Sequence, residues 1–175
     1  MFLSVHEMEL RKLSFQETLA PGAIRFLDRR LCQAGPLRVS GSAELLPNTR
    51  GDIRVHGHLE VQMEVECDRC LEVAGYPVTV DFDLYYEPVA AGPAVDEIAL
   101  EPADSDVDFY EGDGLELEDV LREQILLALP MQALCSEDCK GICPVCGQNR
   151  NHVTCGCRTK APDDRWAALR DLRTS

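Results

Sequence analysis

Apolar and polar residues alternate along three stretches in the first half of the chain, which is typical of strands buried on one face. The longest alternation spans 53–65, and its apolar positions are Ile53, Val55, Leu59, Val61, Met63 and Val65. Shorter alternations cover 37–45 and 76–84. A turn-rich segment at 47–52 and a C-x-x-C loop at 67–70 separate the three stretches. The pattern predicts an antiparallel meander with one apolar and one polar face.

From residue 116 the apolar residues recur with the period of a helix. The apolar stripe consists of Leu117, Val120, Leu121, Ile125 and Ala128. Acidic residues occupy the first turn and Pro130 follows the last one, so we expect a helix over about 116–129 that covers the apolar face of the meander. A second, short helix is expected near Trp166, Leu169 and Leu172. Residues 1–36 are compatible with a strand and a short helix leading into Pro21.

Between residues 87 and 114 the composition shifts to proline, glycine, alanine and acidic residues. The acidic ones are Asp96, Glu97, Glu101, Asp104, Asp106, Asp108, Glu111 and Asp113. We interpret the segment 87–114 as an exposed acidic loop. Such a loop connects two elements, and it can also dock a basic partner.

The charge of the chain limits its binding partners. The 175 residues are 45% hydrophobic and 27% charged, as in a globular protein, and their formal net charge is −14. This charge disfavours unspecific binding to nucleic acid or anionic lipid. Because the chain has neither a run of about 18 apolar residues nor a signal-like N-terminus, we expect a cytoplasmic protein without a membrane partner.

The nine cysteines are clustered rather than evenly spread. Cys32 stands alone and is expected to pack as a small buried hydrophobe. The other eight include two C-x-x-C pairs and one C-x-C pair, and six of them fall within 23 residues. In a reducing compartment such crowding indicates metal binding rather than disulfides.

Zinc prefers four tetrahedral ligands, and a C-x-x-C loop supplies half of such a site. The loop at 143–146 is followed by Gly147, which can adopt the positive φ of a tight turn, and its nearest unused partners form the C-x-C pair. The remaining cysteines lie in the predicted hairpin and just after the predicted helix. We therefore expect two structural Zn²⁺ ions. Their predicted ligand sets are Cys67, Cys70, Cys135 and Cys139, and Cys143, Cys146, Cys155 and Cys157.

Several other assignments of these cysteines stay open. One alternative is a single zinc site with the remaining thiols reduced and buried. An iron–sulfur cluster is a weaker alternative, because the spacings match neither ferredoxin pattern. A thioredoxin-like redox pair is weaker still, because the first C-x-x-C lies between strands rather than at the helix start that such a pair requires. His152 is a reserve ligand that we expect to be exposed. His56 and His58 share the polar face of a strand, and we assign them no role.

No pattern of catalytic residues is present in the sequence. The chain lacks a Gly-rich phosphate loop, the H-E-x-x-H motif and the deaminase H-x-E signature. Both predicted zinc sites have all four ligands, which leaves no open coordination position for a substrate. We expect a non-enzymatic protein that has no small-molecule substrate.

Together these patterns predict an α+β fold of two parts. Residues 1–134 form the antiparallel β-sheet domain with its acidic loop and packed helix. Residues 135–175 form a cysteine-rich, zinc-ribbon-like module with the C-terminal helix.

Four motifs give the chain a family resemblance. They are the stretch 65–72 (VECDRCLE), the pair Leu129-Pro130, the stretch 139–147 (CKGICPVCG) and the stretch 164–169 (DRWAAL). With the spacing of the eight cysteines, they resemble the YceD family of bacterial and plastid proteins, which is implicated in accumulation of the large-subunit ribosomal RNA. Family members that lack the last four cysteines imply that the two ligand sets are separable. The resemblance implies a process but no reaction.

The leading hypothesis is a factor in large ribosomal subunit biogenesis that supports synthesis, processing or stability of 23S rRNA. An acidic chain is suited to hold a basic ribosomal protein or to dock on an assembly intermediate that contains one. Direct but weak RNA binding is the first alternative. It would use a basic face made of Arg150, Arg158, Lys160, Arg165, Arg170 and Arg173. An RNA-processing enzyme is the second alternative.

Overall fold

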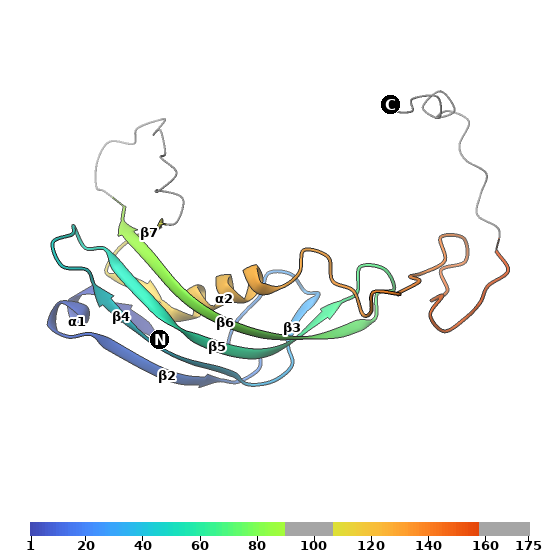
Figure 1. The fold of residues 1–175 in the computed structure, drawn as a ribbon, viewed down its shortest axis with the longest axis horizontal. Coiled ribbons are helices and arrows are strands. Elements are labelled where there is room, and N and C mark those ends of the chain that lie inside the picture. Colours follow the sequence, from blue (N-terminus) through green and yellow to red (C-terminus); the bar gives the residue numbers. More distant parts are fainter. Residues whose placement is uncertain (90–106, 158–175) are drawn as a thin grey trace, which may run out of the picture.

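The computed structural model describes residues 1–89 and 107–157. It is an α+β fold in which a long curved sheet packs against one principal helix (Figure 1). In chain order the elements are β1 (Phe2–Ser4), α1 (Val5–Leu10), β2 (Leu13–Leu19), β3 (Leu31–Gln33), β4 (Leu37–Leu45), β5 (Ile53–Glu66), β6 (Val73–Pro88), β7 (Val107–Tyr110), β8 (Gly114–Glu116) and α2 (Leu117–Ala128).

The predicted meander forms the centre of the sheet. The strand order is β2-β4-β5-β6-β7, and β3 pairs separately with β5. Strands β4, β5 and β6 are successive antiparallel neighbours, and Leu59 of β5 lies between Val39 and Val80 of the flanking strands. All six predicted apolar positions of β5 are buried, because a strand places alternate residues on opposite faces.

One edge of the sheet differs from the prediction. Strand β7 pairs with β6 in parallel, so the sheet is mixed and not purely antiparallel. Both β7 and the start of β8, which pairs with β1, lie within the predicted acidic loop 87–114. The prediction of a loop was therefore wrong for Val107–Tyr110. Residues 90–106 lie outside the described part of the chain.

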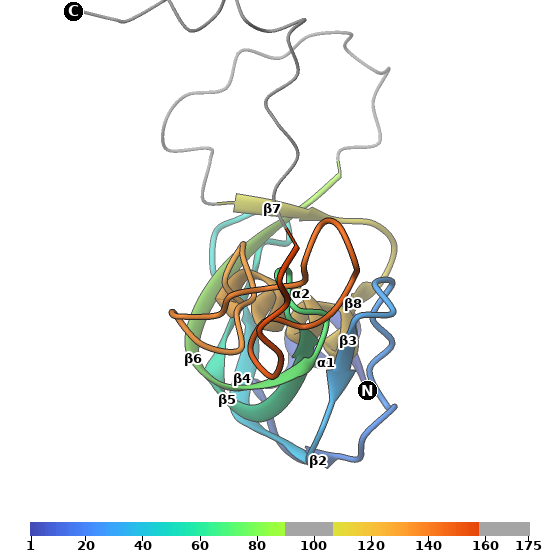
Figure 2. The same ribbon diagram turned by 90° about the vertical axis from the view of Figure 1, so that its right-hand side faces the viewer.

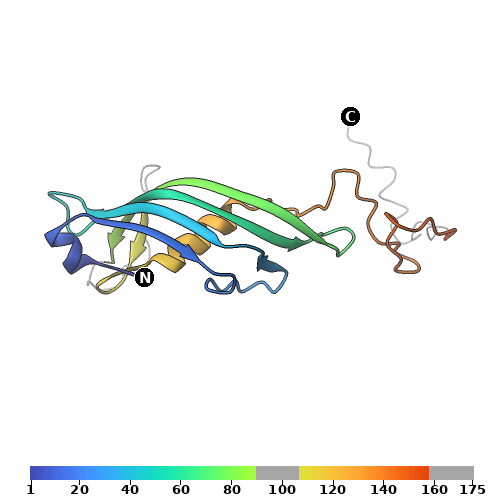
Figure 3. The ribbon, with the colours of Figure 1, turned by 90° about the horizontal axis from the view of Figure 1, so that it is seen from below.

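Helix α2 covers the concave face of the sheet, as predicted (Figure 3). Its Leu117, Val120, Leu121 and Ile125 are buried in one core with the apolar face of β5. The helix ends before Pro130, in agreement with the predicted boundary, and Leu129 has an extended backbone. The opposite face of the sheet carries polar side chains.

The N-terminal region agrees with its prediction in part. The expected strand and short helix are β1 and α1, but a further strand, β2, rather than the helix, leads into Pro21. Cys32 is exposed, so the prediction that it is buried was wrong. The reason is its register in β3, which places it opposite Glu64 on the polar face of β5.

The end of the sheet formed by the β5–β6 hairpin is where the rest of the chain attaches. Residues 130–157 leave α2 and extend past the hairpin tip (Figures 1 and 2). Together, the hairpin tip and this segment carry the eight clustered cysteines. The predicted C-terminal helix lies outside the described residues. Among the residues that the structure describes, no helix combines the length and the apolar character needed to cross a bilayer.

Candidate metal centres

The first group of four cysteines, centre 1, joins the hairpin tip to the segment after α2. It consists of Cys67, Cys70, Cys135 and Cys139, whose Sγ atoms all lie within 4.8 Å of one another. The Sγ atoms of Cys67 and Cys139 are 3.8 Å apart, and those of Cys70 and Cys135 are 3.6 Å apart. Three of the four cysteines are buried, and Leu134 packs against them. The group is therefore a compact sulfur cluster that links distant parts of the chain.

The second group, centre 2, lies farther along the same segment. Its members are Cys143, Cys146, Cys155 and Cys157, and their Sγ atoms also lie within 4.8 Å of one another. Cys143 is buried, whereas Cys146 and Cys157 are exposed. A short antiparallel bridge between Ile142 and Asn149 closes the loop, and the N–H of Cys143 donates to the Gln148 carbonyl at 2.8 Å. Centre 2 is thus the more open of the two.

The two C-x-x-C loops have the same backbone turn. The N–H of Leu71 donates to the carbonyl of Cys67 at 2.9 Å, and the N–H of Gly147 donates to that of Cys143 at 2.8 Å. Both residues have a positive φ, 64° for Leu71 and 74° for Gly147. The predicted conformation of Gly147 is therefore confirmed, and in the first loop a leucine takes it. This turn directs both sulfurs of each loop to the same side.

Hydrogen bonds that do not involve sulfur fix the segment after α2 on the hairpin. Asp68 donates its N–H to the Ala133 carbonyl and accepts the Ala133 N–H through Oδ2, both at 2.8 Å. The Tyr76 hydroxyl donates to the Leu134 carbonyl and accepts the Leu134 N–H, both at 2.6 Å. These bonds position Cys135 opposite the hairpin loop.

Further hydrogen bonds join the residues around centre 1 to those around centre 2. The N–H of Ile142 donates to the Arg69 carbonyl at 2.9 Å, and the Arg69 guanidinium donates to the Cys139 carbonyl at 3.1 Å. The Asn151 side chain donates to the Cys139 sulfur at 3.3 Å and accepts the N–H of Lys140. His152 lies 2.7 Å from Glu72 and is mostly exposed. His152 thus contacts a carboxylate and belongs to neither sulfur cluster.

The sulfur spacing suits a tetrahedral metal ion. Sulfurs about 2.3 Å from a zinc ion at the corners of a tetrahedron are about 3.8 Å apart. A disulfide would bring two of the sulfurs to about 2.05 Å. The distances of 3.6 and 3.8 Å in centre 1 match the tetrahedral value. Both groups of four can therefore hold a metal ion.

The backbone around the first cysteine of each C-x-x-C loop favours the thiolate, which is the metal-binding form. Burial opposes ionisation of Cys67, but hydrogen bonds from the backbone of Cys135, Cys70 and Arg69 together lower its pKa to about 6. Hydrogen bonds from the backbone of Cys146 and Val145 lower the pKa of Cys143 to about 6. In contrast, the interaction with Cys146 raises the pKa of Cys157 to about 12. Four thiolates at this spacing repel one another, and a bound cation relieves the repulsion.

The structure groups the eight cysteines into the two predicted sets. The side chains that position them, those of Asp68, Tyr76 and Asn151, were not predicted from the sequence. Asp68 lies inside a C-x-x-C loop, a location that could have drawn attention to it. No local signal singles out Tyr76, whose partner is 58 residues away. Of the basic face proposed for direct RNA binding, only Arg150 lies within the described residues.

Comparisons with known proteins agree with the resemblance. The chain is 28% identical to the uncharacterized protein YlbN of Bacillus subtilis over 170 residues, which cover 96% of this chain and 92% of that protein. It is 25% identical over 142 residues to the chloroplastic large ribosomal RNA subunit accumulation protein YCED homolog 1 of Arabidopsis thaliana, which covers 69% of this chain but 44% of that protein. The homolog from Zea mays is 25% identical over 134 residues, which cover 63% of this chain and 46% of the maize protein.

No solved structure is significantly similar to this chain. The family described as large ribosomal RNA subunit accumulation protein YceD matches residues 55–173. This match begins in β5 and includes both cysteine groups. The chain therefore belongs to the YceD family.

Proposed function

We propose that this protein is a non-enzymatic factor in large ribosomal subunit biogenesis that supports accumulation of 23S rRNA. The observation that carries the proposal is the family match over residues 55–173, which contains both cysteine groups. The names of the chloroplast relatives support the same process. In this proposal the protein acts by binding a basic ribosomal protein or an assembly intermediate that contains one.

Each cysteine group holds one structural Zn²⁺ ion in this proposal. Thiolate ligands and tetrahedral spacing favour zinc, and a four-thiolate site has no open position for a substrate. The bound ion would cross-link the hairpin to the segment after α2, which has few large apolar side chains of its own. Metal binding would therefore stabilise the fold of this segment.

The partner is proposed from charge. The chain has a formal net charge of −14, and each four-thiolate zinc centre adds a charge of about −2. A surface with this charge repels phosphates and attracts lysine and arginine side chains. A basic ribosomal protein fits this surface better than bare rRNA does. Binding to rRNA through the predicted basic face is the competing mechanism.

Deletion of the gene tests the process, and complementation tests the metal sites. We expect the ratio of 23S to 16S rRNA to fall in the deletion strain and to recover with the wild-type gene. Cys139→Ser and Cys143→Ser should not restore it, whereas Cys32→Ser should, because Cys32 lies outside both groups. An unchanged rRNA ratio in the deletion strain would refute the proposed process.

Purified protein separates the two binding mechanisms. We expect it to retain basic large-subunit proteins and not bare 23S rRNA at physiological salt. Salt-resistant binding of rRNA, lost on charge reversal of Arg158 and Lys160, would support the competing mechanism. Turnover of precursor rRNA by the metal-loaded protein, abolished by one carboxylate substitution, would instead indicate an enzyme.

A further inference from the structure

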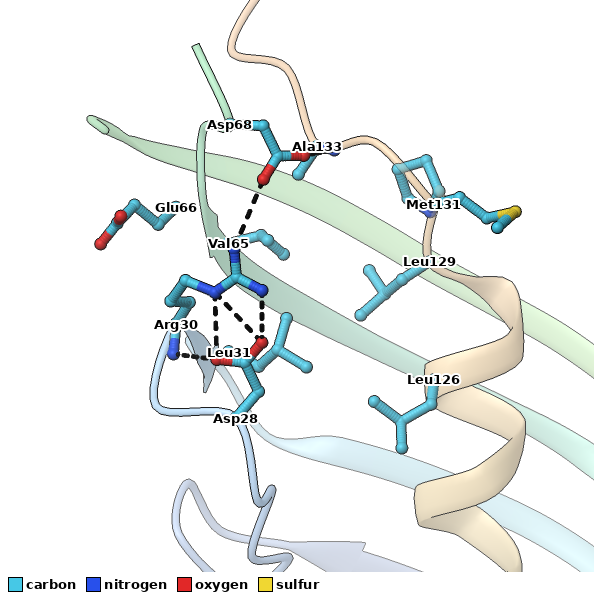
Figure 4. Close-up of a pocket in the computed structure, with 11 residues that line it drawn as sticks. Asp28, Arg30, Leu31, Val65, Glu66, Asp68, Leu126, Leu129, Met131 and Ala133 are labelled. Carbon is cyan, nitrogen blue, oxygen red and sulfur yellow. Dashed lines mark hydrogen bonds and ion pairs between the residues drawn. The ribbon is translucent and has the colours of Figure 1, made fainter. Parts of the chain in front are cut away.

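An apolar groove lies beside centre 1, between the end of α2 and the edge of the sheet. Its volume is about 220 Å³, and its apolar lining includes Leu31 and Val65 from the sheet and Leu126, Leu129 and Met131 from α2 and the following turn. Figure 4 shows the leucine side chains of both elements directed into the space between them. The groove is smaller than the roughly 300–1,000 Å³ of small-molecule sites, so it suits a single side chain of a partner.

Part of this apolar lining is in contact with solvent. Met131 is fully exposed and Leu126 is 43% exposed, although both flank the groove. Adjacent exposed apolar side chains beside a concave site are typical of an interaction surface, since covering them with a partner is favourable.

The rim of the groove is acidic. Its carboxylates are Asp28, Glu66 and Asp68, and its one basic side chain is Arg30. Arg30 donates to Asp28 at 2.8 Å and lies 3.5 Å from Asp68, so two carboxylates neutralise it (Figure 4). Glu66 has no ion-pair partner among the described residues. The rim therefore keeps a negative charge that a basic partner can neutralise.

Centre 1 adds to this charge, if it holds zinc as proposed above. Asp68 lies between Cys67 and Cys70, and Ala133, which also lines the groove, precedes Cys135 by two residues. A four-thiolate zinc centre with a charge of about −2 would thus adjoin the rim. The metal would also hold Ala133 and the turn with Met131 in place. The groove and its charge are therefore coupled to the metal site.

We infer that this groove binds a basic segment of the ribosomal protein partner. A large apolar side chain of the segment enters between Leu126 and Met131, and flanking lysine or arginine side chains contact Glu66 and the neighbouring carboxylates. This inference rests on the proposed function and adds the location and chemistry of its binding site. An RNA segment fits poorly here, because its phosphates would face the net negative charge of the rim.

The probe is the RNA-free protein fraction of purified large ribosomal subunits, passed over the immobilised, zinc-loaded full-length chain. Retained proteins are identified by mass spectrometry, and the Kd of the one that binds most tightly is then measured. The double variant Leu126→Ser/Met131→Ser removes the apolar contact, and Glu66→Lys reverses the rim charge. The matched controls are Leu10→Ser and Glu9→Lys, exposed positions in α1 at the other end of the sheet (Figure 1).

We expect the wild type to retain a basic protein, and both groove variants to raise its Kd by about tenfold or more. The controls should stay within about twofold of the wild type. Circular dichroism and a zinc content equal to that of the wild type verify that the variants fold. Equal affinities of all variants, or no retained protein, would refute the inference.

Three other occupants of the groove would also refute it. Binding of bare rRNA that the groove variants abolish would indicate a nucleic-acid site. Loss of dimers in the groove variants would indicate a second copy of the chain. A difference in the fluorescence of Trp166, the only tryptophan, between the wild type and the groove variants, measured without a partner, would indicate that the chain's own C-terminal segment occupies the groove. If the groove binds its basic protein but gene deletion leaves 23S rRNA unchanged, only the proposed function fails.

Discussion

The Sγ atoms of Cys67 and Cys139 lie 3.8 Å apart, although 72 residues separate them in the chain. Cys67 directly follows the long strand β5, which ends at Glu66, and Cys139 belongs to the segment that follows α2. Closing a loop of this length costs a few kcal/mol of chain entropy by order of magnitude, and metal binding at centre 1 would offset this cost. The contact therefore couples metal binding to the attachment of the cysteine-rich segment.

Replacement of Cys139 by serine tests this coupling. We expect Cys139→Ser to lower the zinc content from two ions per chain to one and to expose the amides of 133–142 to hydrogen exchange. Zinc affinity at centre 1 should fall by more than about a hundredfold, because a thiolate ligand is lost. Cys32→Ser is the matched control, since Cys32 is exposed and lies outside both centres. An unchanged zinc content in Cys139→Ser would contradict the assignment.

The Tyr76 hydroxyl should stabilise the same attachment without touching the metal. Tyr76→Phe removes two hydrogen bonds of 2.6 Å and leaves the N–H and carbonyl of Leu134 unpaired. We expect the free energy of unfolding in urea to fall by about 1–3 kcal/mol while zinc content stays at two. Tyr85→Phe, at a partly exposed position, should change the stability by less than about 0.5 kcal/mol. Equal effects of the two substitutions would argue against this role of Tyr76.

Two glycines separate steric from conformational effects in the cysteine-rich segment. Gly141 and Gly147 have φ values of 66° and 74°, but a Cβ on Gly141 would lie 2.8 Å from the Arg69 carbonyl oxygen, whereas one on Gly147 would meet nothing within 4 Å. Gly147→Ala should therefore weaken the free energy of zinc binding by about 1–2 kcal/mol through backbone strain alone. Gly141→Ala should weaken it more, and competition with a chromophoric chelator would measure the zinc affinity of both variants. A larger loss of zinc affinity in Gly147→Ala than in Gly141→Ala would contradict the packing of Gly141 on Arg69.

The polar face of the sheet should show a defined pH dependence. Hydrogen bonds from His58 to Asp81 and then to Glu60 raise the pKa of His58 above 6.5. The interaction stabilises the fold fully at a pH below the pKa that His58 has in the unfolded chain. This stabilisation is lost as the pH rises through the higher pKa that His58 has in the folded protein. Asp81→Asn should lower the pKa of His58 in an NMR titration. A pKa unchanged by this substitution would show that Asp81 is not the main cause.

The sequence predicted the elements whose pattern directly reflects burial. Strand β5 is buried on one face over its whole length, so its apolar residues repeat every two positions. Helix α2 presents one stripe to the core, so its boundaries follow from the apolar period and Pro130. The two groups of cysteines were predicted from the spacing of the cysteines together with the expected packing of the hairpin against the segment after the helix.

Features that depend on distant contacts were not predictable. Strand β7 has four residues in an acidic context, and its parallel pairing with β6 is set by tertiary structure. The exposure of Cys32 follows from its register opposite Glu64, which the sequence of β3 does not specify. The bonds of Tyr76 join a side chain to the backbone 58 residues away, and such pairs leave no periodic signal.

Metal content of the native protein tests the central claim most directly. Native mass spectrometry of the full chain, purified without oxygen or chelator, should show two zinc ions per chain. Removal of zinc should then abolish the exchange protection of residues 133–157 while strands β4, β5 and β6 stay protected. A metal-free chain that protects 133–157 as well as the purified protein does would contradict the account.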